Sequence, residues 1–138
     1  MRAPSSLVLL FIAPVAVLAT ACTPSLSTPI AEIPKLTTLS AVMANQATVA
    51  DPQFSKMDTV AYNDADYAAF AEVSERIQAT SLKIKDFSKG PEFDGLAMRL
   101  GEKAKALGTA AAAKDAKGSS TALKEMKATC KECHSKFR

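Results

Sequence analysis

The sequence predicts an all-α protein, with an up-down-up-down four-helix bundle as its architecture. Ala, Lys, Leu and Glu fill the second half of the chain, and these residues favour helices. Apolar residues also recur at steps of three and four along four separate stretches, which is the period of a helix face. The 138 residues, 48% of them hydrophobic, suffice for one domain of usual size. Because each apolar stripe must be buried against the others, a bundle is the economical arrangement.

Residues 1–21 have the layout of a secretory signal peptide, with Arg2, an apolar run over residues 7–19 and small residues before Cys22. The apolar run is too short to span a membrane comfortably. Residues 18–22 resemble a bacterial lipobox, in which Cys22 becomes the lipidated first residue; ordinary signal cleavage is the alternative. Lipidation is favoured because it consumes the odd thiol of an exported chain. We therefore expect a periplasmic protein that contacts the membrane only through an N-terminal lipid anchor.

Residues 22–35 carry three prolines among serines and threonines, a composition that favours a flexible spacer. Such a spacer would tether a folded domain of residues 36–138 to the anchor. The alternative is a disordered N-terminal arm without that role.

The first two helices are predicted from their apolar faces. The first begins at Leu36, with the other face residues at steps of three and four, and ends near residues 51–52. After a linker to about residue 62, Asn63 or Asp64 can cap the second helix, which stops around residues 87–90.

The third helix starts at Pro91, which suits a first helical turn because its missing N–H has no partner there. Gly101 and Gly108 within this helix either weaken it locally or let another helix approach closely. After a break at residues 115–120, the fourth helix carries a regular apolar seam of Leu123, Met126, Cys130, Cys133 and Phe137.

The fourth helix contains Cys130-Lys131-Glu132-Cys133-His134, the attachment signature of c-type haem. At offsets of zero, three and four residues, the two thiols and the imidazole share one helix face. Two thiols can then add across the haem vinyl groups while His134 binds the iron. A disulfide or a thioredoxin-like dithiol would be expected at a helix N-terminus instead, and a zinc site lacks ligands because His134 is the only histidine.

This motif on the last helix, followed by Phe137 and Arg138, resembles the class II c-type cytochromes, the cytochrome c prime family. The resemblance covers residues 36–138. It implies a four-helix bundle with one covalent haem c and its iron, held by Cys130 and Cys133. It also implies that His134 is the fifth iron ligand and that Arg138 lies near a haem propionate or the proximal face.

In this family the residue facing the sixth iron position comes from the first helix and is either a ligating methionine or an apolar side chain. Met43 lies on the apolar face of that helix and is the predicted metal ligand. The alternative is that Met43 only fills a gap in the core. Leu39 departs from the basic residue that family members often carry one turn earlier. Met57, Met98 and Met126 are less suitably placed than Met43.

The predicted function is single-electron transfer by a periplasmic monohaem cytochrome with His134 and Met43 as axial ligands. Periplasmic or membrane redox proteins would be its partners. The alternative is a five-coordinate cytochrome c prime that binds NO or CO. Catalysis is not expected, because no second acid or base is evident near Met43, and Glu32 and Asp51 lie too far along the chain.

The charge balance of 17 Lys and Arg against 14 Asp and Glu, without a long single-sign run, argues against nucleic-acid binding. Lysines in the last two helices either form a basic rim for an acidic redox partner or are a solvated face. They are Lys103, Lys105, Lys114, Lys117, Lys124, Lys127, Lys131 and Lys136. Flat helix faces in such bundles often dimerise, which leaves a homodimer open.

Overall fold

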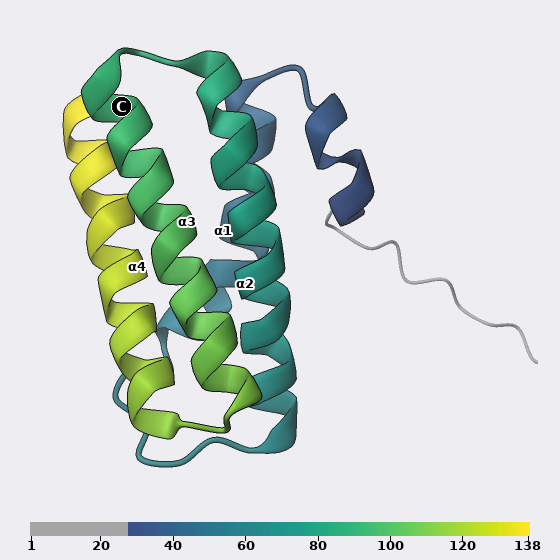
Figure 1. Cartoon of the computed structure of the whole chain (residues 1–138), viewed down its shortest axis with the longest axis vertical. Helices are drawn as coiled ribbons and strands as arrows, with labels where there is room; N and C mark the ends of the chain where they lie inside the picture. The colour runs from purple at the N-terminus through teal and green to yellow at the C-terminus, as the bar shows by residue number, and fades with distance from the viewer. Residues whose placement is uncertain (1–27) are drawn as a thin grey trace, which may run out of the picture.

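Four long helices alternate in direction in the computed structural model, which describes residues 28–138 (Figure 1). The described part also contains two short 3-10 helices, η1 (Ile30–Lys35) and η2 (Lys85–Phe87), and no strand. The predicted four-helix bundle is confirmed. The long helices are α1 (Leu39–Phe54), α2 (Asp64–Ile84), α3 (Pro91–Ala112) and α4 (Ala116–Phe137).

Side-chain caps set the helix starts. Asn63, rather than Asp64, caps α2: its side chain accepts from the Asp66 N–H at 2.9 Å, and the Asp66 carboxylate accepts from the Asn63 N–H at 3.0 Å. This reciprocal pair is a capping box, although with Asp in the place of the usual Glu. Pro91 begins α3 after Gly90, whose φ of 113° requires a residue without a side chain.

Four predicted helix ends differ from the structure, one of them that of α2, which ends at Ile84 instead of residues 87–90 and passes into η2. The helix α1 begins at Leu39 instead of Leu36, because Thr38 caps it by accepting from the Ala41 N–H at 3.2 Å. It also continues to Phe54, since a proline in the last turn removes one backbone hydrogen bond without stopping the helix. The helix α4 begins directly after its cap Asp115, which accepts from the N–H of Gly118 at 2.9 Å.

The prediction of a flexible spacer over residues 22–35 is wrong for its described part, residues 28–35. Ile33 of η1 is fully buried against α2. Buried Arg76 donates to the Thr28 carbonyl, and the Thr28 N–H donates to Asn45 at 3.1 Å. This clamp of Thr28, Asn45 and Arg76 fixes the segment to the bundle. The predicted signal peptide, Cys22 and the rest of the spacer lie outside the described residues.

The glycines of α3 face serines of α2. A Cβ added at Gly108 would lie 2.4 Å from Ser74 Oγ, and one added at Gly101 would lie 3.3 Å from Ser81 Cβ. Real Cβ contacts are rarely that short, so the two glycines are positions of close helix approach. This resolves the question that the sequence left open, because the backbones of α2 and α3 pack tightly where a side chain is missing.

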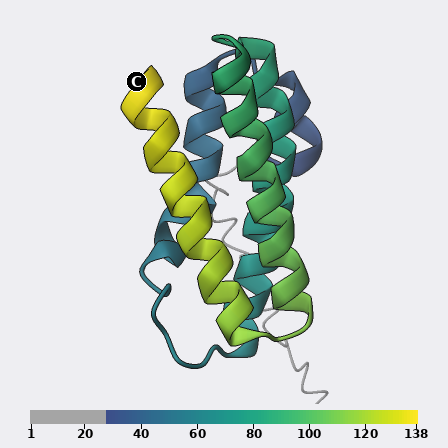
Figure 2. The same cartoon turned by 60° about the vertical axis from the view of Figure 1, so that its left-hand side comes forward.

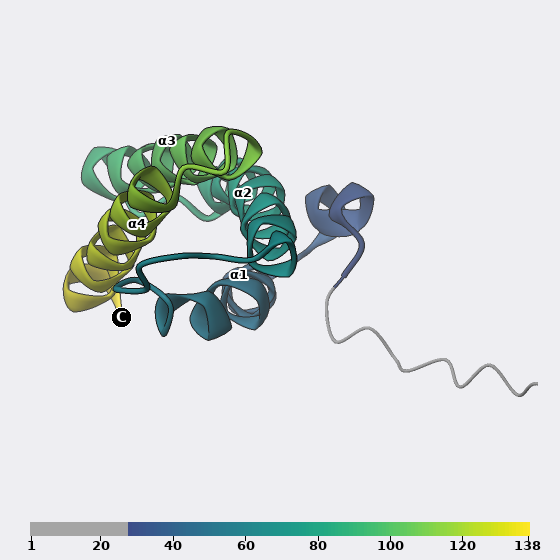
Figure 3. The same ribbon diagram turned by 90° about the horizontal axis from the view of Figure 1, so that it is seen from below.

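The helices α1 and α4 pack much less against each other than α2 does against α3 or α3 against α4. Figure 2 shows α4 inclined to α3, so that the two are closest at their connecting turn and diverge toward the C-terminus. Seen along the bundle in Figure 3, α1 and α4 stand apart at one side. None of the helices in residues 28–138 is long and apolar enough to cross a membrane.

Candidate haem site

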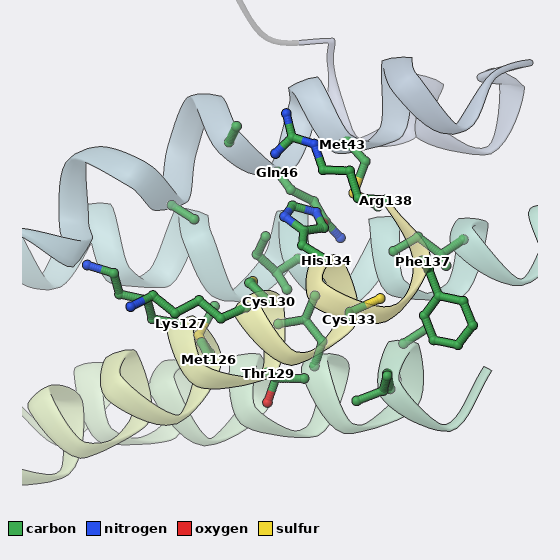
Figure 4. Close-up of a pocket in the computed structure, with 18 of the residues that line it drawn as sticks. Met43, Gln46, Met126, Lys127, Thr129, Cys130, Cys133, His134, Phe137 and Arg138 are labelled. Atoms are coloured by element: carbon green, nitrogen blue, oxygen red, sulfur yellow. The ribbon is translucent and has the colours of Figure 1, made fainter. Parts of the chain in front are cut away.

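A cavity of about 1250 Å³ opens between α1 and the C-terminal half of α4 (Figure 4). Ligand pockets usually enclose roughly 300–1,000 Å³, so this one suits a large ligand. Its depth is apolar, with side chains from all four long helices. They include Leu39 and Phe54 of α1, Ile77 and Ile84 of α2, Phe93, Leu96 and Leu100 of α3, and Met126 and Phe137 of α4.

Cys130, Cys133 and His134 form one wall of this cavity. Because they fall within four residues of α4, the helix presents all three from a single turn. The two thiols are free and half-buried, while His134 is exposed. The structure therefore brings together two sulfurs and an imidazole beside an apolar space, as the sequence predicted.

Burial governs the chemistry of the two thiols. It raises the pKa of Cys130 to about 11, with smaller contributions from the Asp51 carboxylate and from Cys133. The pKa of Cys133 is also raised, again mainly by burial, although the charge of Lys89 opposes the shift. Both sulfurs consequently stand in the cavity as neutral S–H groups at neutral pH.

The opposite wall is α1, which contributes Met43 and Gln46 from adjacent turns. Met43 is half-buried and packs with Leu39 and Phe137 in an apolar cluster around Val42 and Phe93. Figure 4 draws its side chain at the level of Arg138 along the helices.

Gln46 is a cavity residue that sequence reasoning missed. Gln46 is polar, and a polar residue in an amphipathic helix is usually expected to face solvent. The apolar pattern of this helix instead placed the next residue, Ala47, on the buried face. The structure instead buries Gln46 and places exposed Ala47 at the cavity as well. The available signal was helical spacing, because Gln46 follows Leu39 by seven residues and Met43 by three and so shares their face, whereas its buried partner Thr80 is 34 residues away.

The other methionines of residues 28–138 lie in three different environments, none of them on the α1 wall of the cavity. Met126 is fully buried and lines the cavity from α4, beside the cysteines. Met57 packs on the neighbouring core, and Met98 is 54% exposed on α3. Of the methionines in residues 28–138, Met43 is the one that reaches the cavity from the helix facing α4.

Cationic side chains surround the mouth of the cavity. Lys89, Lys127, Lys131 and Arg138 line it, whereas Asp51 is the one acidic side chain there among residues 28–138. Lys89 donates to the Phe137 carbonyl at 2.7 Å, and Lys127 lies 5.6 Å from the centre of the Phe54 ring. A ligand with an apolar body and anionic groups at one edge would match this distribution.

The eight lysines considered for a basic rim do not form one band. Lys103, Lys114, Lys124 and Lys136 form ion pairs with Glu125, Asp64, Asp58 and Glu92, at 2.5 to 3.0 Å. Only Lys127 and Lys131 of the eight line the cavity. Most of this set is therefore a solvated face with surface ion pairs.

Paired thiols, one imidazole, an apolar cavity and cations at its mouth are what a covalently held haem requires, so the residues present fit that group. Fold and site together define a helical-bundle c-type cytochrome. Comparison with known proteins agrees: the family model described as Cytochrome C' matches residues 35–138. The chain belongs to the cytochrome c' family and carries covalent haem c with its iron.

One curated relative is a cytochrome c' from Pararhodospirillum photometricum, 41% identical over 71 residues. The match covers 51% of this chain and 57% of the relative, so the chain spans little more than half the length of that protein. No solved structure gives a significant match.

Proposed function

We propose that this cytochrome binds NO or CO at an open sixth position of its haem iron. The position of Met43 carries the proposal. Its side chain packs, together with those of Leu39 and Phe137, against the buried cluster that contains Val42 and Phe93, so it is held as part of an apolar cluster. An apolar wall there crowds the sixth position without supplying a ligand. Membership of the cytochrome c' family supports the same function.

The proposal gives each wall of the cavity a role in holding the haem. Cys130 and Cys133 form the thioethers, each adding its sulfur and its proton across one vinyl group, which the neutral state of both thiols allows. His134 follows Cys133 on the same turn and becomes the fifth ligand. Arg138 and Lys131 at the mouth neutralise the propionates.

Electron transfer with His134 and Met43 as axial ligands is the second candidate. One observation favours it: Met43 lines the cavity on the helix opposite α4, and an unbranched side chain can change rotamer readily. Ligation would make the iron low-spin and raise its reduction potential, because a thioether favours the reduced metal.

Optical and electron paramagnetic resonance spectra of the holo-protein, with and without carbon monoxide, separate the two candidates. We expect a high-spin spectrum whose reduced Soret band shifts with carbon monoxide and is little changed by Met43→Leu. Met126→Leu is the matched control from the α4 side. A low-spin spectrum that ignores carbon monoxide and turns high-spin in Met43→Leu would overturn the gas-binding proposal and establish the electron carrier.

We further propose that the chain is not an enzyme. Asp51, which the sequence placed far from the haem, does line the cavity, but it is exposed on α1 two turns from Met43. Its charge acts on Cys130 at the α4 wall. A reduced holo-protein that consumed peroxide or nitric oxide over many turnovers would contradict this proposal.

For its location we propose the periplasm, with Cys22 as a lipid anchor and a redox protein as partner. The signal-like residues 1–21 support this placement. Mass spectrometry of the mature N-terminus tests it: a diacylglyceryl mass on Cys22, absent in Cys22→Ala, is the expected result. A mature chain that begins at an unmodified Cys22 would show ordinary signal cleavage, and an intact Met1 would show that the chain is not exported.

A further inference from the structure

Gln46 is a buried polar side chain in the otherwise apolar α1 wall of the haem cavity. It is only 7% exposed, and its Nε2 donates to Thr80 Oγ1 of α2 at 3.0 Å. A buried amide is costly unless it is hydrogen-bonded. The bond to Thr80 explains how the amide is tolerated, but a leucine would fill the same place without needing a partner.

Thr80 fixes which end of the amide faces α2. Thr80 is fully buried, and its single hydroxyl proton is directed to the Arg76 carbonyl at 2.8 Å or the Ile77 carbonyl at 3.1 Å. The hydroxyl can therefore only accept from Gln46, which places Nε2 toward Thr80. Within residues 28–138, Thr80 is the one hydrogen-bond partner of the Gln46 side chain, so its second N–H and its amide oxygen both remain available.

The packing places Gln46 level with the haem-binding turn of α4. Met43, one turn before Gln46, packs with Cys133 against the smaller buried cluster, which contains Val42 and Phe93. Ala50, one turn after Gln46, belongs to the larger core cluster, against which Cys130 packs. Gln46 lies between these levels. Figure 4 agrees, because it draws Gln46 at the level of His134 along the helices and Met43 farther along, at the level of Arg138.

We propose that Gln46 donates a hydrogen bond from its free N–H to a diatomic ligand at the sixth iron position, and that Thr80 is the positioning residue for it. This inference rests on the proposed gas binding. A donor at this place favours ligands whose outer atom gains negative charge on binding. Gln46 would then set which gas is held, while Met43 crowds the site.

The infrared C–O stretch of the reduced holo-protein with carbon monoxide tests the inference. Gln46→Leu should raise the frequency, since a lost donor weakens back-donation, and should weaken carbon monoxide binding by about fivefold, the equivalent of one hydrogen bond. Thr80→Val should broaden or split the band, because the amide is no longer oriented. Gln78→Leu is the matched control: its amide donates to Ser74 of the same helix and does not line the cavity.

Each outcome is decisive. If the haem binds carbon monoxide but the C–O stretch and the affinity do not change in Gln46→Leu, the inference fails while the proposed function stands. If the haem does not bind carbon monoxide at all, both fail. A shift of similar size in Gln78→Leu would show a general effect of losing an amide, and would also refute the inference. Should Gln46→Leu not yield holo-protein, Gln46→Ile, which lacks the N–H and has no atom that can bind iron, carries the same expectation.

Discussion

Replacing single glycines of α3 by alanine tests the close packing of α2 against α3. Gly95 and Gly108 lie in the same helix, but a Cβ meets nothing within 4 Å at Gly95 and Ser74 Oγ at 2.4 Å at Gly108. Alanine gains about 1 kcal/mol over glycine in a helix interior. Gly95→Ala should therefore raise the free energy of unfolding by about that amount.

In Gly108→Ala the same gain is offset by two costs. The new Cβ forces Ser74 to move, and overpacking of a core costs roughly 1–3 kcal/mol. Moving its hydroxyl also breaks the bond that it accepts from Gln78 Nε2 at 3.0 Å, which contributes about 1 kcal/mol. The net result is a loss of roughly 1–3 kcal/mol, so the two variants should differ by about 2–4 kcal/mol.

Chemical denaturation of the holo-protein at equilibrium measures this difference, with Gly101→Ala expected between the two because its Cβ would lie 3.3 Å from Ser81 Cβ. Ser74→Gly should partly restore Gly108→Ala, since it removes the obstructing side chain. Equal stabilisation by alanine at positions 95 and 108 would refute the close approach of the two helices.

Three further predictions concern charge, thiols and the cofactor. The pKa of Asp66 is held below its ordinary 3.8, chiefly by the hydrogen bond from Lys56. The Asp66 carboxylate therefore stabilises the fold fully above pH 3.8, and this stabilisation is lost as the pH falls through the lowered pKa of the folded state. Asp66→Asn should flatten the acid limb of the stability profile below about pH 4, and an unchanged limb in thermal melts would contradict this. In the apo-protein, a pKa of about 11 means that alkylation of Cys130 should rise about tenfold per pH unit up to pH ~10, and a rate that already levels off just above the ordinary thiol pKa of 9.0 would disprove the burial. Without haem, backbone amides of α1 should exchange hydrogen at least about tenfold faster than in the holo-protein, because α1 has few contacts with α4. Exchange in α2 and α3 should change little. Equal protection of α1 in both forms would show that the cofactor does not hold this helix.

The sequence was sufficient for the bundle and for one wall of the site. Helix period is a local signal and is confirmed in α4, where offsets of three and four residues bring the two cysteines and the histidine of the motif to one face. The cap of α2 was narrowed to Asn63 or Asp64, and the capping box with Asp66 decided between them. Helix ends were less accurate because a single cap, such as Thr38, outweighs the apolar pattern.

The features that the sequence did not reveal depend on partners far along the chain. Gln46 is buried because Thr80 accepts its proton, and residues 28–35 are ordered because Arg76 reaches the Thr28 carbonyl. Local composition indicated solvent exposure in both cases. Asp51 is a third example, since distance along the chain said nothing about its place at the cavity.

The clamp of Thr28, Asn45 and Arg76 has a mechanical consequence. It fastens the start of the described chain to the outer side of α2, and Figure 3 shows η1 on the side of α2 away from α4. A pull on the chain upstream of Thr28 would therefore reach the domain first at α1 and α2, and not at the haem-binding turn of α4. If Cys22 anchors the chain, as proposed, the tether would join the domain on the side of α2 away from α4, which leaves the turn of Cys130, Cys133 and His134 far from the point of attachment.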